Sequence, residues 1–379
     1  MHLNTLFITL IILNGEDLMK ARTRDFIHTK EDLYFATTNY IHPKDRIISF
    51  LRYIPDKNGD REKNGKKYRK VSSDEAYSYL REKYPEYLYF CDVTNIEMMG
   101  VPYKQIKEII KPEKRLVEIR KEFEDKSFKT SKNSSNTDFY KKLVDLSDFF
   151  HYIGGIDYKH LGISGSILPN LQKSEISDLD FVVFGLKNHK KAVETFEKYK
   201  NKTIEIKELK KTVKIHSIGK DFWNSLYEKR IKDDSLTMKE FSFYESRKSN
   251  RGVIENTLFD ILATRNWNEI KGVWGGIKYK SVGKSTIECE VKNAIGSYDN
   301  PAVYKIANVE VLDGDNFPIE EIASFTHTYA GQARDGEKII AKGKVEMVCE
   351  HMKEKYYRLV IGTTRESIGE YIKLKNEIY

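Results

Sequence analysis

Residues 161–185 read LGISGSILPNLQKSEISDLDFVVFG and predict a strand, a turn and a second strand. The first apolar run ends at Gly165-Ser166, where a turn can offer backbone N–H groups to a phosphate. After a polar connection of eleven residues, Asp178 and Asp180 open the apolar run 181–184. Side chains alternate along a strand, so both carboxylates are expected on one face. Two carboxylates beside a phosphate-binding turn suit a divalent metal in phosphoryl transfer.

Each part of this pattern also has an ordinary structural explanation. Gly-Ser occurs in many turns, and Asp-x-Asp often marks a solvated strand end. A third carboxylate strengthens the functional interpretation, because Asp260 stands second in the apolar run 259–265, which predicts another strand. The alternative for Asp260 is a solvated or helix-facing aspartate before an apolar strand. The prediction of a site therefore depends on all three features occurring in this order.

With these residues in this order, the chain resembles the polymerase-β-type nucleotidyltransferase superfamily. The resemblance rests on Gly165-Ser166, Asp178-x-Asp180 and the later lone Asp260, and it covers residues 160–265. The flanking regions resemble those of an archaeal group of predicted nucleotidyltransferases, a match that names no substrate. The resemblance implies a small mixed α/β sheet with flanking helices at the centre of the chain.

The resemblance also implies roles for individual residues. Ser166 and the backbone amides near Gly165 would hold the β- and γ-phosphates of a nucleoside triphosphate. Asp178 and Asp180 would bind two Mg²⁺ ions, and Asp260 would complete the site for the metal that activates the attacking hydroxyl. Two further cations are candidates for phosphate contacts, with an ordinary surface charge as the alternative for each: Arg265 and Lys190.

The chain has 379 residues, enough for two or three domains. Changes of pattern predict an α+β protein with a basic N-terminal α+β domain at 19–115 and a linker at 116–136. A mixed α/β nucleotidyltransferase domain is expected at 137–268, although residues 201–250 show no clear order of elements. Short strands at regular spacing predict a small C-terminal β-barrel or sandwich at 269–379.

Several local elements can be predicted within these domains. In the N-terminal domain, residues 33–38 and 46–55 have strand composition, and Ser72 with Glu75 forms a capping-box pattern at a helix start. Residues 105–110 are expected to form a short helix. In the central domain, helices are expected at 137–152 and 189–199.

The net charge of +8 is concentrated in the first third of the chain. Residues 19–135 hold 26 basic and 19 acidic residues, and the run from Lys57 to Lys70 alone holds seven basic and two acidic ones. One interpretation of this run is a solvated hairpin tip. The other is a contact with the phosphate backbone of a nucleic acid, in which Tyr53 and Tyr68 stack on bases.

Composition excludes several classes of protein. Three widely spaced cysteines (Cys91, Cys289 and Cys349) argue against a disulfide scaffold or a zinc knuckle, and favour a reducing cytoplasm. No apolar run reaches the length of a membrane span. The segment from Leu6 to Leu13 lacks the flanks of a signal peptide, so we expect either an extra edge strand or residues that precede a true start at Met19.

Together these features predict a cytoplasmic, Mg²⁺-dependent nucleotidyltransferase that moves a nucleotidyl group from a triphosphate to a hydroxyl. The acceptor is expected to be RNA, presented by the basic N-terminal domain and the C-terminal β domain. Two alternatives remain open from the sequence. One is an enzyme that nucleotidylates a protein hydroxyl, and the other is a non-catalytic, nucleotidyltransferase-like protein that binds RNA and senses a nucleotide.

Overall fold

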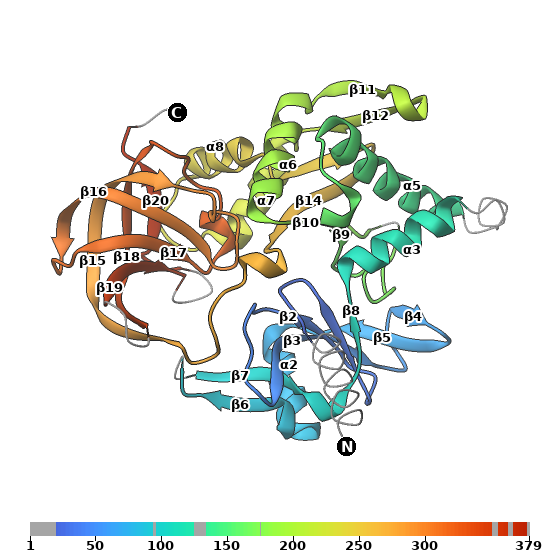
Figure 1. Cartoon of the computed structure of the whole chain (residues 1–379), viewed down its shortest axis with the longest axis horizontal. Helices are drawn as coiled ribbons and strands as arrows, with labels where there is room; N and C mark the ends of the chain where they lie inside the picture. Colours follow the sequence, from blue (N-terminus) through green and yellow to red (C-terminus); the bar gives the residue numbers. More distant parts are fainter. Residues whose placement is uncertain are drawn as a thin grey trace, which may run out of the picture.

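The computed structural model describes residues 20–93, 96–124, 134–174, 176–350, 355–362 and 367–376. These form an α+β protein with three units, each built on its own sheet (Figure 1). We call residues 20–110 the N-terminal unit, 112–268 the central unit and 277–376 the C-terminal unit. The segment from Leu6 to Leu13, predicted as an edge strand or as residues before the true start, lies outside the described residues.

The N-terminal unit is an eight-stranded sheet with one helix on it. The sheet follows the order β4-β5-β3-β2-β1-β8, and β7 pairs with both β3 and β6. Its elements are β1 Phe26–Thr29, β2 Tyr34–Thr37, β3 Arg46–Pro55, β4 Arg61–Lys63, β5 Lys66–Lys70, α2 Ser73–Lys83, β6 Leu88–Cys91, β7 Ile96–Pro102 and β8 Ile106–Ile110. Ser72 and Glu75 form the predicted capping box. The helix predicted at 105–110 is wrong, because the isoleucine-rich segment pairs with β1 as strand β8.

The central unit is a six-stranded mixed sheet in the order β11-β12-β13-β14-β10-β9. Its elements are α3 Pro112–Glu124, α5 Ser134–Asp148, a π-helical turn Phe149–Ile153, β9 Leu161–Ile163, β10 Leu179–Phe184, α6 Leu186–Tyr199, β11 Lys202–Ile206, β12 Lys211–His216, α7 Lys220–Arg230, α8 Met238–Lys248, β13 Arg251–Ile254 and β14 Thr257–Thr264. Strand β10 pairs antiparallel with β9 and parallel with β14. This parallel pair brings two distant parts of the sequence together.

The predicted linker at 116–136 overlaps helix α3, so its first part belongs to the central unit. Leu116 and Ile119 of α3 are buried in the same core as the inward side chains of β9, β10 and β14. The helix also crosses β9 so closely that a Cβ on Gly162 would overlap the backbone of Pro112. The polarity of 112–124 suggested a connector, but the residues at helical spacing on one face are apolar and are buried.

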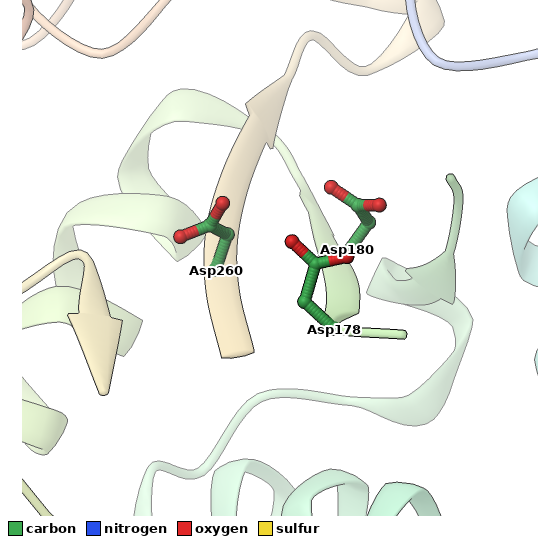
Figure 2. A group of neighbouring side chains, drawn as sticks. All are labelled: Asp178, Asp180 and Asp260. Atoms are coloured by element: carbon green, nitrogen blue, oxygen red, sulfur yellow. The ribbon is translucent and has the colours of Figure 1, made fainter. Parts of the chain in front are cut away.

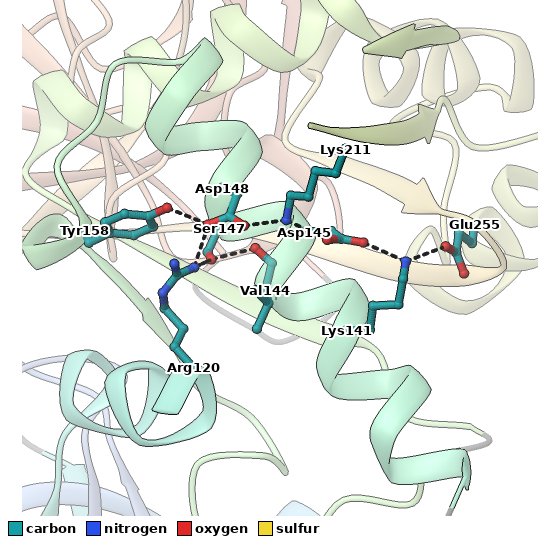
Figure 3. Close-up of polar contacts among 9 residues, drawn as sticks. All are labelled: Arg120, Lys141, Val144, Asp145, Ser147, Asp148, Tyr158, Lys211 and Glu255. Atoms are coloured by element: carbon teal, nitrogen blue, oxygen red, sulfur yellow. Dashed lines mark hydrogen bonds and ion pairs between the residues drawn. The ribbon is translucent and has the colours of Figure 1, made fainter. Parts of the chain in front are cut away.

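A buried ion network ties helix α3 to the rest of the central unit (Figure 3). Arg120 of α3 donates 2.6 Å hydrogen bonds to Ser147 Oγ and to Asp148 Oδ1. Asp148 also accepts from Tyr158 and from Lys211 of β12. Burial raises the pKa of Asp148, but the hydrogen bonds from these three partners outweigh it and hold that pKa below its usual value.

Helices α7 and α8 form a hairpin inserted between β12 and β13, in the region that the sequence left without order. Their apolar side chains, including Phe241 and Tyr244, share one core with the strands of the C-terminal unit. The predicted boundary near residue 268 therefore falls between the two sheets, but the α7–α8 hairpin that precedes it belongs to the core of the C-terminal unit. In Figure 1, α8 lies beside the C-terminal barrel.

The C-terminal unit is a β-barrel, one of the two predicted architectures. Its strands are β15 Ile277–Asn293, β16 Ala302–Gly314, β17 Ile319–Ser324, β18 Lys338–Glu350, β19 Tyr356–Ile361 and β20 Tyr371–Leu374. The order β15-β16-β17-β19-β18 closes through a β15–β18 pair, and β20 adds to β18. Long strands that bury alternate residues fill the barrel interior.

Two expectations from composition can be compared with the fold. The three cysteines are unpaired, as expected in the absence of a disulfide scaffold, and Cys91 and Cys289 are buried. Within the described ranges, no helix combines the length and the apolar character needed to cross a membrane.

We expect Leu116→Ala to lower the free energy of unfolding by about 2–5 kcal/mol, because the side chain fills the central core. Urea denaturation of the full chain, followed by tryptophan fluorescence, measures this loss. Val117→Ala is the matched control, since Val117 is 47% exposed on the same helix, and it should cost far less. Equal effects of the two substitutions would contradict the placement of α3 in the core.

Candidate functional site

The parallel pairing of β10 with β14 places Asp180 directly opposite Asp260. Asp178 stands two residues before Asp180, just before β10 begins, so its side chain points to the same face. Figure 2 shows the three carboxylates gathered at this edge of the two strands. One oxygen from each carboxylate lies within 4.8 Å of the others. The sequence motif and the lone aspartate therefore form one cluster.

The Gly165-Ser166 turn lies against this cluster. Gly165 has a φ of +62°, and a Cβ at that position would overlap Oδ2 of Asp180. The backbone N–H of Ser164 donates to the carbonyl of Asp180 at 2.9 Å, which fixes the turn beside β10. Only glycine combines this backbone conformation with the space that the carboxylate needs.

Burial and the closeness of the three carboxylates change the pKa of Asp180. Burial, and then the charges of Asp178 and Asp260, raise the pKa of Asp180 to about 7. Arg24 and Lys70, both from the N-terminal unit, oppose this shift. At neutral pH, Asp180 thus holds a proton in a substantial fraction of molecules unless further positive charge joins the cluster.

Arg251 neutralises the third carboxylate. It stands opposite Asp260 in the β13–β14 hairpin, and its Nη2 donates to Asp260 Oδ2 at 2.8 Å while its Nε donates to Oδ1. This two-point ion pair fixes the orientation of Asp260. Sequence reasoning missed Arg251, because residues 251–260 were not recognised as a hairpin.

A cavity of about 140 Å³ opens beside Asp180 and Asp260. Its lining includes the cationic side chains Arg24 of the N-terminal unit, Arg230 at the end of α7, and Arg251. These residues come from three separate segments, and none carries a motif that could have marked it in the sequence. The three-dimensional junction of the units, and not spacing along the chain, creates this part of the site.

The N-terminal unit packs directly on the loop between Gly165 and Asp178. Tyr53 and Tyr68 are each 3% exposed and share an apolar cluster with Leu168 and Leu171. Arg61 donates to the carbonyl of Leu171 at 2.5 Å. The predicted stacking of these tyrosines on bases is therefore wrong, since their rings are used to hold two units of the protein together.

Part of the basic run at 57–70 faces the aspartates. Burial, and then repulsion from Arg52 and Arg61, lower the pKa of Lys70, whereas Asp178 and Asp180 raise it. Other cations of the run have partners within the unit, for example Lys66 with Asp32 at 2.7 Å. The run thus forms a β-hairpin, in agreement with one of its two interpretations. The side of the hairpin that carries Lys70 contributes positive charge to the site.

Arg265 does not join the cluster. It follows β14, about 16 Å of extended chain beyond Asp260, and its Nε donates to Asp299 Oδ2 at 2.7 Å. Its guanidinium also lies over the ring of Tyr40, at 5.2 Å from the centroid. The structure gives Arg265 these structural partners in place of the predicted phosphate contact. Lys190 likewise lies 3.6 Å from Asp335 of the C-terminal unit.

Comparisons with known proteins extend over nearly the whole chain. Over 366 residues, the chain is 42% identical to a protein of Methanocaldococcus jannaschii named "Uncharacterized protein MJ1086". The match covers 94% of this chain and 100% of that protein, so it includes all three units. No family model matches the chain, and no solved structure matches it.

The raised pKa of Asp180 predicts a pH-dependent stability. The folded protein retains this proton up to about pH 7, whereas an unfolded aspartate releases it near pH 4. The stabilisation from proton binding is complete below the unfolded pKa and is lost as the pH rises through 7. We expect the melting temperature of Asp180→Asn, relative to wild type without metal, to rise by at least about 2 °C between pH 5 and pH 8.

Differential scanning fluorimetry in EDTA measures this difference. Asp234→Asn is the control, because Asp234 is exposed, and its curve should stay parallel to that of wild type. A curve for Asp180→Asn that also runs parallel to wild type would show that Asp180 titrates normally.

Proposed function

The chain belongs to the family of the M. jannaschii protein, and we propose that it is a Mg²⁺-dependent nucleotidyltransferase. It would transfer a nucleotidyl group from a nucleoside triphosphate to a hydroxyl of an acceptor, for which we propose RNA. One observation carries the proposal: Asp178, Asp180 and Asp260 gather on neighbouring parallel strands beside a glycine turn. The mixed sheet around β10 and β14 fits the nucleotidyltransferase core that the sequence resembles.

The donor set fits magnesium. All three side chains offer carboxylate oxygens, the ligands that hard divalent cations prefer. Burial, and then repulsion from Asp178 and Asp260, raise the pKa of Asp180, and a bound cation would offset this destabilisation of the ionised carboxylate. Asp178 and Asp180 would hold two Mg²⁺ ions, with Asp260 as the third ligand to one of them. Bound Mg²⁺ supplies activation of a hydroxyl and charge relief for a leaving pyrophosphate.

The protein's own groups would position the substrates. The turn at Gly165 and Ser166 lies beside Asp180, where its backbone N–H groups can approach a triphosphate without steric hindrance from a side chain. Arg251 holds Asp260 in a fixed orientation through two hydrogen bonds. Preorganised charges and ligands of this kind lower the barrier because no reorganisation is needed during the reaction.

Charge and architecture support RNA as the acceptor. The N-terminal unit, with 18 basic and 14 acidic residues, carries half of the chain's net charge of +8. It places Lys70 near Asp178 and Asp180, with Arg52 beside Lys70. Neither side chain has an ion-pair partner among the described residues. Cations next to a catalytic centre attract a phosphate backbone. Small closed five-stranded barrels, such as the one in the C-terminal unit, are also used to bind oligonucleotides.

Transfer is tested by incubating the full chain with Mg²⁺, labelled ATP, CTP, GTP or UTP, and either bulk RNA or bulk protein. We expect label on RNA. Asp178→Asn, Asp180→Asn and Asp260→Asn should each lower the rate by about a thousandfold, with little change in RNA affinity. Asp234→Asn removes an equal charge from an exposed position and should retain full activity.

Each other outcome identifies a different function. Label on protein would favour protein nucleotidylation, the enzymatic alternative. No label on any acceptor, together with salt-sensitive RNA binding, would favour a non-catalytic RNA-binding protein. Full activity in the three aspartate variants would contradict the assignment of the metal site.

A further inference from the structure

The cavity beside Asp260 is distinct from the side of the site that carries the Gly165-Ser166 turn. Asp180 and Asp260 line this cavity, whereas Asp178, Gly165 and Ser166 do not. If the turn holds the triphosphate, the cavity offers a second binding space beside the same carboxylates. All three units contribute to its wall, with Arg24 from the N-terminal unit, Arg230 and Lys248 from the α7–α8 hairpin, and His327 from the C-terminal unit.

Two guanidinium groups in this cavity have no hydrogen-bond partner among the described residues: those of Arg24 and Arg230. The one nearby carboxylate from the hairpin, Glu245, is already paired with buried Lys248, whose Nζ also donates to the carbonyl of Thr328 at 2.7 Å. Nη1 of Arg230 approaches Glu245 only to 3.8 Å. With Asp180 and Asp260 also counted, the four lysine and arginine side chains that line the cavity outnumber its three carboxylates. An excess of positive charge in a largely buried, polar cavity indicates an anionic ligand.

The backbone at Arg24 is held in a conformation that non-glycine residues rarely adopt, with φ +77°. Its carbonyl accepts a 2.8 Å hydrogen bond from Ser164 Oγ, and the N–H of Arg24 donates to the carbonyl of Thr37. On either side, Arg22 and buried Asp25 anchor the turn through a hydrogen bond from the Arg22 N–H to Asp25. A strained residue fixed from both sides, with a free side chain in a cavity, suits ligand binding.

We propose that this cavity is the acceptor site, and that it binds a phosphate group carried close to the hydroxyl that receives the nucleotide. The inference rests on the proposed function, because Asp260 is taken as the carboxylate on the acceptor side. In that reaction the acceptor oxygen bonds to the α-phosphorus, the bond from the α-phosphorus to the bridging oxygen breaks, pyrophosphate leaves, and the hydroxyl proton passes to water.

The size of the cavity restricts the acceptor. The cavity, of about 140 Å³, has room for several water molecules. That space accepts a phosphate with a few neighbouring atoms. Two kinds of acceptor carry a phosphate close to a hydroxyl. One is the terminal nucleotide of an RNA chain, and the other is a free phosphorylated small molecule, for example a nucleoside monophosphate. The cationic lining therefore favours an acceptor that carries a phosphate over a neutral Ser, Thr or Tyr hydroxyl of a protein.

Binding of inorganic phosphate to the full chain, measured by isothermal titration calorimetry, tests the cavity without requiring catalysis. Arg230→Gln and Arg24→Gln should each weaken binding by about tenfold or more, because each removes a charge-assisted hydrogen bond. Arg230→Lys should restore part of the affinity. Lys229→Gln is the matched control, since Lys229 neighbours Arg230 and is exposed. Unchanged phosphate affinity in both arginine variants overturns the inference.

Steady-state kinetics test whether the phosphate bound in the cavity belongs to the acceptor or to the triphosphate. With a 3′-hydroxyl RNA oligonucleotide or a nucleoside monophosphate as acceptor, Arg230→Gln should raise the KM for the acceptor by about tenfold and leave the KM for the triphosphate within about twofold. Activity with only one of the two acceptors identifies the source of the phosphate. A rise in the KM for the triphosphate alone, or label on protein, overturns the inference.

The two proposals fail in different ways. If wild type transfers nothing, the proposed function fails, while loss of phosphate binding in Arg230→Gln would still establish an anion site. If wild type transfers a nucleotide and both arginine variants behave like wild type, the acceptor site fails and the proposed function remains. Melting curves of each variant exclude loss of folding, and the two arginines come from different units, so a folding defect is not expected to affect both.

Discussion

The parallel pairing of β10 with β14 is the constraint on which the site depends. It brings Asp180 opposite Asp260 across 80 residues of sequence, and the pleat then adds Asp178 to the same face. Such a pairing concentrates negative charge, which costs free energy when the carboxylates are partly buried. Burial and the two neighbouring charges raise the pKa of Asp180. A divalent cation bound between the carboxylates would offset this cost.

The rest of the molecule supplies positive charge to this face. Arg251 pairs with Asp260 from the neighbouring strand, and Arg24 reaches the cavity from the N-terminal unit. The α7–α8 hairpin joins the core of the C-terminal barrel, so it carries Arg230 to the same place. The three units therefore meet around the aspartates, which explains why the first and last thirds of the chain matter to a site built on the central sheet.

The carboxylate cluster could be predicted from the sequence because strand periodicity fixes the face of Asp178 and Asp180, and because Asp260 opens an apolar run. The cations could not, because Arg24 and Arg230 reach the cavity through contacts between units, which leave no local pattern. For Tyr53 and Tyr68, by contrast, the local sequence suggested a functional role that the structure does not support. Their basic neighbourhood suggested exposure, but both rings are buried against the loop of the central unit. Local spacing predicted the strands at 46–55, 181–184 and 259–265 and the capping box, and it gave a barrel as one of two C-terminal architectures. It failed at 105–110, which is strand β8, and polarity misled at 112–124, where only one helical face is apolar.

The central claim is that the three aspartates form one divalent-cation site. Titration of the full chain with Mn²⁺, a paramagnetic substitute for Mg²⁺, tests it through the electron paramagnetic resonance signal of the free ion. We expect wild type and Asp234→Asn to bind Mn²⁺ equally, and Asp178→Asn, Asp180→Asn and Asp260→Asn each to bind at least about tenfold more weakly. Equal Mn²⁺ affinity in all five proteins would contradict the account.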